Sequence, residues 1–238
     1  MNYKETYSSK RQLNRLGLQT FFLNLEHNHF KNAIDKLLIE KEIELNSLKS
    51  KKESLKNFKD FDNEIDNEFG IMFLEKELFA ITEMKISYTY KHFETHLKFL
   101  IAASFPNIKE SELYKWDFMT HFLNSKNIKI KEIENYNEIN ELREVNNSIK
   151  HSRSLINNKT KNIKEFNKIT NLTYVALNLF YTRIENSSRT FLTALAYEIE
   201  KDLYEFDDER LENMAAKIAL RMDETTINNL ISKINRIN

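Results

Sequence analysis

Apolar residues recur at intervals of three, four and seven along most of this chain, which is the period of amphipathic helices. The first such stripe runs from Leu13 to Leu55, and it predicts a long helix packed in a bundle. A coiled-coil arm is the alternative, but the stripe lasts only about three heptads and carries Lys52 at a seam position. Residues 1–12 are polar and are expected to be frayed, and the Asp- and Asn-rich segment 60–70 is expected to be a loop.

A second and stronger pattern occupies residues 71–104, where apolar side chains fall at helical intervals until Pro106 ends the run. It predicts one unusually long central helix. The remainder is expected to hold a helix over 111–123, a break at 124–127, a helix over 137–151, a loop over 152–162, a long helix or kinked pair over 167–203, and two short helices capped by Asp207 or Asp208 and by Asp223. In the 137–151 helix the residues expected to face inward are Ile139, Leu142, Val145 and Ile149.

The composition agrees with an all-α fold. Two Gly and one Pro in 238 residues leave little with which to build tight hairpins or strand-to-helix turns. We therefore predict a helical bundle with one or two long central helices, formed by residues 1–238 as a single domain of six to nine helices. The absence of cysteine excludes disulfides, thiolate metal sites and a cysteine nucleophile.

Two further features bear on where the protein works. The first residues are polar and charged with no apolar run behind them, and no apolar stretch approaches the length of a membrane span. We expect a cytoplasmic protein with no membrane partner. Positive and negative side chains balance at 36 each, so the formal net charge is zero.

His92 and His96 are the histidines that could share a metal ion, because residues four apart lie on one face of a helix. No third ligand is marked out by the sequence, which favours a packing or surface role. We therefore expect no metal and no cofactor.

His151 ends a predicted helix at the start of a polar loop, a position typical of catalytic side chains. Arg143, Asn147 and His151 are spaced four and four, so they project from one face while Val145 and Ile149 lie opposite. Spacing alone is also compatible with a solvated polar stripe.

The charge next to His151 favours a functional interpretation. Residues 150–168 carry six positive side chains against Glu165 alone, net +5 in a chain whose total is zero. Phosphate is the natural ligand of such a segment. The candidate RNA-binding residues are Lys150, Arg153, Lys159, Lys161 and Lys164.

The residues 87–97, SYTYKHFETHL, followed by 142–151, LREVNNSIKH, resemble the HEPN superfamily of helical domains. The family signature is Arg, then a polar residue that is often Asn, then three residues and His. Asn147 and His151 match it, whereas Asn146 stands where the Arg is expected. Arg143 is too far from His151, with seven residues between them where the family allows four to six. The resemblance places a HEPN-like core at about residues 71–205.

The resemblance implies metal-independent cleavage of single-stranded RNA in a cleft where two copies of the motif meet across a homodimer. It also implies a toxin-antitoxin or antiphage defence system, with a cognate antitoxin or another defence protein as partner. The candidate catalytic residues are His151, Asn147, Asn146 and Arg143. A histidine can move protons near neutral pH and an Asn can orient the phosphate, while the missing Arg would have stabilised the phosphoryl charge.

Two alternatives remain beside the ribonuclease. One is a non-catalytic HEPN-like subunit that dimerises and binds RNA or a partner protein, and the other is a helical adaptor unrelated to HEPN. If the lost Arg alone limits catalysis, Asn146→Arg should rebuild the motif and accelerate cleavage.

Overall fold

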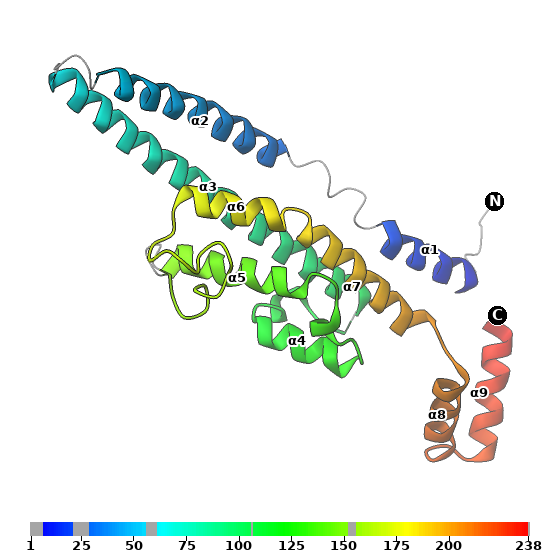
Figure 1. Cartoon of the computed structure of the whole chain (residues 1–238). Coiled ribbons are helices and arrows are strands. Elements are labelled where there is room, and N and C mark those ends of the chain that lie inside the picture. The colour runs from blue at the N-terminus through cyan, green and yellow to red at the C-terminus, as the bar shows by residue number, and fades with distance from the viewer. Residues whose placement is uncertain (1–6, 21–28, 56–60, 106, 152–155, 238) are drawn as a thin grey trace, which may run out of the picture.

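A computed structural model describes residues 7–20, 29–55, 61–105, 107–151 and 156–237 (Figure 1). Within these ranges there is no β-strand, which confirms the all-α fold. The α-helices are α1 (Tyr7–Thr20), α2 (His29–Leu55), α3 (Phe61–Ser104), α4 (Trp116–Ser125), α5 (Tyr136–His151), α6 (Tyr174–Ile184), α7 (Ser187–Tyr204), α8 (Asp208–Ala219) and α9 (Glu224–Ile237), with the short 3-10 helices η2 (Glu110–Glu112) and η3 (Ile130–Glu132).

The 44-residue helix α3 is the spine of the molecule, roughly 66 Å long at 1.5 Å per residue. The predicted long helix is therefore confirmed, but it begins at Phe61, so the loop expected at 60–70 is wrong over its described part. Packing against α2 explains the difference. Asn67 is buried and donates a hydrogen bond to the Leu48 carbonyl (3.0 Å), and a Cβ added to Gly70 would meet the Leu48 side chain at 3.0 Å. Tertiary contact here outweighs the low helix propensity of the segment.

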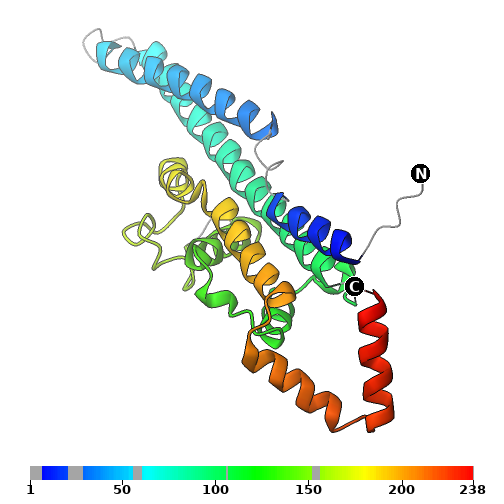
Figure 2. The same ribbon diagram turned by 90° about the vertical axis from the view of Figure 1, so that its right-hand side faces the viewer.

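Helix α2 packs along the first half of α3 as an antiparallel two-helix arm (Figures 1 and 2). The arm has its own apolar cluster, formed by Ile34, Leu38 and Leu45 of α2 and Leu74, Leu78 and Ile81 of α3. The stripe over 13–55 was expected to be one helix inside the bundle, and this is corrected: its described parts are α1 and α2, and α2 lies mainly along α3 rather than inside the bundle. Residues 7–12, expected to be frayed, belong to α1.

The second half of α3 packs with α4, α5, α6 and α7 around two apolar clusters. The larger cluster includes Phe93, Leu97, Leu100, Met119, Leu123, Ile139, Phe191, Leu195 and Ile199. The smaller one includes Ile86, Leu142, Val145, Phe166, Leu177 and Phe180. Helix α5 contributes to both, so its orientation is tightly determined.

Several boundaries differ from the expected ones by about one or two turns. Ser111 lies in η2, and the α-helix expected from 111 begins at Trp116 and ends at Ser125. The helix pair expected from 167 begins at Tyr174, where the Thr173 hydroxyl caps the Ala176 amide, and the pair breaks between Ile184 and Ser187. The expected break at 124–127 and the helix over 137–151 are confirmed.

The two short C-terminal helices are confirmed together with their caps. The Asp207 carboxylate accepts a hydrogen bond from the Arg210 amide (2.8 Å), and that of Asp223 accepts one from the Thr226 amide (2.7 Å). Neither α8 nor α9 contributes a residue to the three apolar clusters. No helix in the described ranges is long and apolar enough to cross a membrane.

Candidate nucleic-acid interface

Helix α5 has the orientation that its sequence predicts. Leu142 and Val145 are fully buried, and Ile149 is partly buried against the smaller cluster. Asn147 is half-buried and His151 is exposed at the last residue of the helix. His151 therefore lies at the exposed end of the polar face of α5.

Asn146 faces the interior. It lies seven residues after Ile139 and four after Leu142, so it shares their buried side of the helix, and only 1% of it is exposed. Neither atom of its side-chain amide has a hydrogen-bond partner within the described residues. The position where the motif expects Arg therefore points into the bundle. A guanidinium introduced there would enter the core instead of the surface groove that the sequence suggested.

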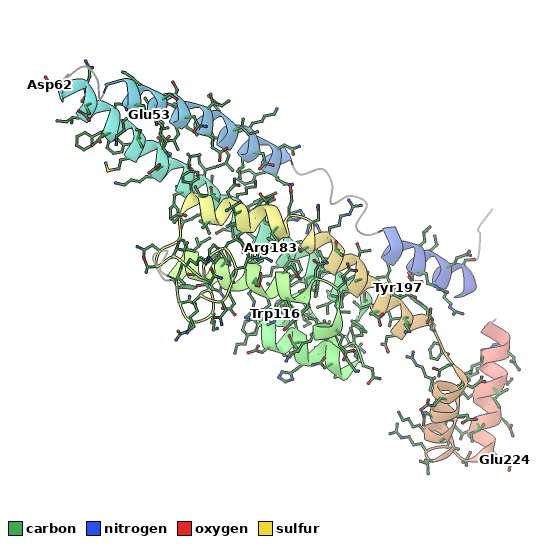
Figure 3. The ribbon with its side chains drawn as sticks, viewed as in Figure 1. Glu53, Asp62, Trp116, Arg183, Tyr197 and Glu224 are labelled. Carbon is green, nitrogen blue, oxygen red and sulfur yellow. The ribbon has the colours of Figure 1, made fainter. Side chains whose placement is uncertain are left out.

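Arg143 is held by its neighbours. Its Nη2 donates to Glu144 Oε1 (2.6 Å) and to Asn140 Oδ1 (3.0 Å), and its guanidinium lies 5.4 Å from the ring centre of Trp116, the first residue of α4 (Figure 3). The Glu144 side chain is only 9% exposed. A charged hydrogen bond to a buried carboxylate is strong, so Arg143 is committed to this contact.

The segment 156–173 was expected to be a polar loop over its first part, and the structure gives it a packed form. Asn157 Oδ1 accepts hydrogen bonds from the amides of Lys159 (2.8 Å) and Thr160 (3.1 Å). Thr160 is buried, and Ile163 and Phe166 enter the smaller cluster. The basic segment is therefore anchored beside α5.

Arg183 joins this segment to two helices. From α6 its Nε donates to Glu165 Oε1 (2.7 Å), and its Nη2 donates to Glu165 Oε2 (2.9 Å) and to Glu141 Oε2 of α5 (2.7 Å) (Figure 3). The hydrogen bond to Glu165 is the main cause that raises the pKa of Arg183. Burial alone would raise the pKa of Glu165, but the hydrogen bonds that its carboxylate accepts from Arg183 and from its own backbone, together with the charges of Arg183 and Lys164, outweigh burial and lower the pKa.

The predicted lysines differ in whether they form an ion pair. Lys150, Lys161 and Lys164 are exposed, and none of the three forms an ion pair within the described residues. Lys159 is also exposed, but its Nζ lies 3.5 Å from Glu144 Oε2. Arg153 lies outside the described residues. Among the described residues, the predicted RNA-binding side chains are therefore all lysines.

Sequence reasoning missed Glu144 and Arg183. Glu144 holds Arg143 and meets Lys159, and Arg183 bridges residues 18 and 42 positions away. No local spacing marks Arg183. Spacing does not mark Glu144 either, because each residue turns a helix by about 100°, which places Glu144 away from the predicted buried face.

The rings of His92 and His96 are in contact at a tilt of 45°, with centroids 4.1 Å apart, and His96 Nδ1 lies 2.7 Å from the His92 carbonyl oxygen. Burial and the neighbouring His96 lower the pKa of His92. Within the described part of the chain, no three potential ligands from His, Cys, Asp and Glu gather closely enough to hold a metal ion.

Comparison with protein-family models, curated proteins and solved structures finds no match for this chain. The exposed imidazole of His151 and the half-buried amide of Asn147 lie at the end of α5, exposed lysines lie at its last turn and on the segment packed beside it, and the nearest described guanidinium on α5 is engaged by Glu144. Such a surface can attract phosphates through charge.

Proposed function

We propose that this chain is a HEPN-like RNA-binding subunit of a toxin-antitoxin or antiphage system, and that it does not itself cleave RNA. The observation that carries the proposal is the Arg143 to Glu144 contact (2.6 Å), which occupies the guanidinium closest along α5 to the motif. Buried Asn146 stands where the motif's own Arg is expected.

The chemistry explains why this matters. Cleavage of RNA by its 2′-hydroxyl builds negative charge on the phosphoryl oxygens, and a guanidinium placed to meet that charge is worth roughly 10²- to 10³-fold in rate. Moving Arg143 to a phosphate would leave the buried Glu144 carboxylate with Lys159 as its one remaining ion-pair partner among the described residues, which is costly. Binding requires no such movement, because exposed lysines already face solvent.

The proposal predicts that RNA affinity depends on Lys161 and Lys164. Charge reversal of both to Glu is expected to weaken binding of single-stranded RNA of any sequence. It should also lower the slope of log affinity against log salt by about 1.4, since each lost phosphate contact removes about 0.7. Fluorescence anisotropy with a labelled oligonucleotide at several salt concentrations measures both quantities.

The matched control is Lys36→Glu with Lys109→Glu, which makes the same charge change on α2 and beside η2. It should leave affinity nearly unchanged at moderate salt, because those charges lie away from the end of α5. Equal losses in both double variants would mean that net charge alone governs binding. No loss in either would reject the interface.

The second candidate is a metal-independent ribonuclease acting on single-stranded RNA. It is favoured by Asn147 and His151, which lie one turn apart at the outer end of α5. A homodimer with both His151 side chains facing one groove would be required. Total RNA incubated with the protein in EDTA should stay intact under our proposal. Cleavage that disappears in His151→Ala would overturn it in favour of the nuclease, and absence of both cleavage and binding would favour the unrelated adaptor.

A further inference from the structure

Helices α8 and α9 carry an apolar face that no other described part of the chain covers. Each has apolar residues at the spacing of a helix–helix seam, namely three, four and seven. On α8 these are Leu211, Met214, Ala215 and Ile218, and on α9 they are Ile227, Leu230, Ile231 and Ile234. Leu211 and Ile231 are each 50% exposed, and no residue of α8 is buried.

The two helices do not close on each other. Figure 2 shows them diverging from the turn that joins them, so they form an open V at one end of the molecule. A helix pair of this kind cannot bury its apolar stripes alone, and contiguous exposed apolar surface marks an interaction site.

We propose that a second copy of this chain covers this face, with α8 and α9 of one copy packing in antiparallel orientation against α8 and α9 of the other. The charges support this occupant. Both helices are acidic where they begin, at Asp208 with Glu209 and at Glu224, and basic where they end, at Lys217 and at Arg236. Antiparallel packing places unlike ends together, whereas parallel packing places like ends together.

Two-fold symmetry also favours a second copy. The face supplies four apolar residues from each helix, so two copies bring sixteen apolar side chains into one seam. A two-fold axis lets the same stripe serve both copies and closes the assembly at a dimer. Net charge is zero, so overall repulsion does not oppose association.

The position of this interface separates it from the one that a HEPN nuclease requires. Helices α8 and α9 lie at one end of the molecule and the last turn of α5 lies toward the other (Figure 1). A dimer formed through α8 and α9 would therefore keep the two His151 side chains apart. This consequence rests on the proposed function: if the chain binds RNA, such a dimer would present two basic surfaces to one RNA, and the gain in affinity would come from avidity.

The first test is the mass of the full-length protein in solution. Sedimentation or light scattering at tens of micromolar should give twice the chain mass of 28.5 kDa. Met214→Glu with Ile231→Glu should raise the dimer dissociation constant by at least about 100-fold, because four charges then enter the symmetric seam. Ile43→Glu with Phe69→Glu, at exposed apolar positions of the α2–α3 arm, is the control and should leave the dimer intact. Circular dichroism confirms that the variants keep their helices.

The second test locates the interface. Equal amounts of isotopically light and heavy protein are mixed and treated with a lysine-reactive cross-linker. Links between light and heavy chains are expected among Lys217 and Lys233, the lysines of α8 and α9. Links between light and heavy chains confined to Lys150 and Lys161 would place the contact at α5 and overturn the inference. A wild-type protein that stays monomeric would also overturn it. Neither result depends on RNA binding, so failure here and failure of the proposed function can be told apart.

Discussion

Asn146→Arg is expected to lower the free energy of unfolding by about 3 to 5 kcal/mol and to produce no ribonuclease activity. Position 146 is 1% exposed on the side of α5 that also buries Leu142, so the longer charged side chain would have to be desolvated or would push α5 away. Sequence alone suggested the opposite, a gain of activity. Urea denaturation followed by circular dichroism measures the loss.

Asn146→Leu is the matched variant. The native amide has no hydrogen-bond partner within the described residues, so an apolar side chain of similar shape removes a desolvation cost. We expect unchanged stability or a gain of up to about 2 kcal/mol. A stable, folded Asn146→Arg protein that cleaves RNA faster than wild type would contradict both the burial argument and the non-catalytic proposal.

Arg183→Met is expected to lower the free energy of unfolding by about 3 to 5 kcal/mol at pH 7. It leaves the Glu165 carboxylate, whose side chain is only 5% exposed, without its partner. Because segment 156–173 carries the lysines of the interface, the variant should also bind RNA more weakly. Arg221→Met, at an exposed position after α8, should change neither quantity.

The same contact sets a pH dependence. The pKa of Glu165 is lowered in the folded protein, so its contact with Arg183 stabilises the fold above the ordinary value of 4.5 and is lost as pH falls through the folded value. Wild type should therefore lose more stability than Arg183→Met between about pH 5 and pH 3, measured by urea denaturation at each pH. Parallel losses in the two proteins would show that other carboxylates govern acid sensitivity.

The all-α fold, the long helix α3, the register of α5 and the caps of α8 and α9 could be predicted because each rests on local information. The period of apolar side chains determines which face of a helix is buried, and an Asp before a helix satisfies its first free amides. The inward side of Leu142 and Val145 followed from spacing alone. Asn146 lies four residues after Leu142 and is buried in the structure, whereas the motif resemblance had assigned it to the catalytic site.

What spacing could not determine depends on partners distant in the chain. Residues 61–70 are helical because α2 packs on them, with Asn67 and Gly70 both meeting Leu48. Segment 156–173 is fixed in place because its Glu165 pairs with Arg183 of α6 and its Ile163 and Phe166 enter the smaller apolar cluster. By itself, the sequence determined the helices and a basic segment next to His151. Only the tertiary structure decided that Arg143 is bound by a buried Glu144 and that the face of α8 and α9 stays uncovered, because burial and charge pairing depend on which helices become neighbours.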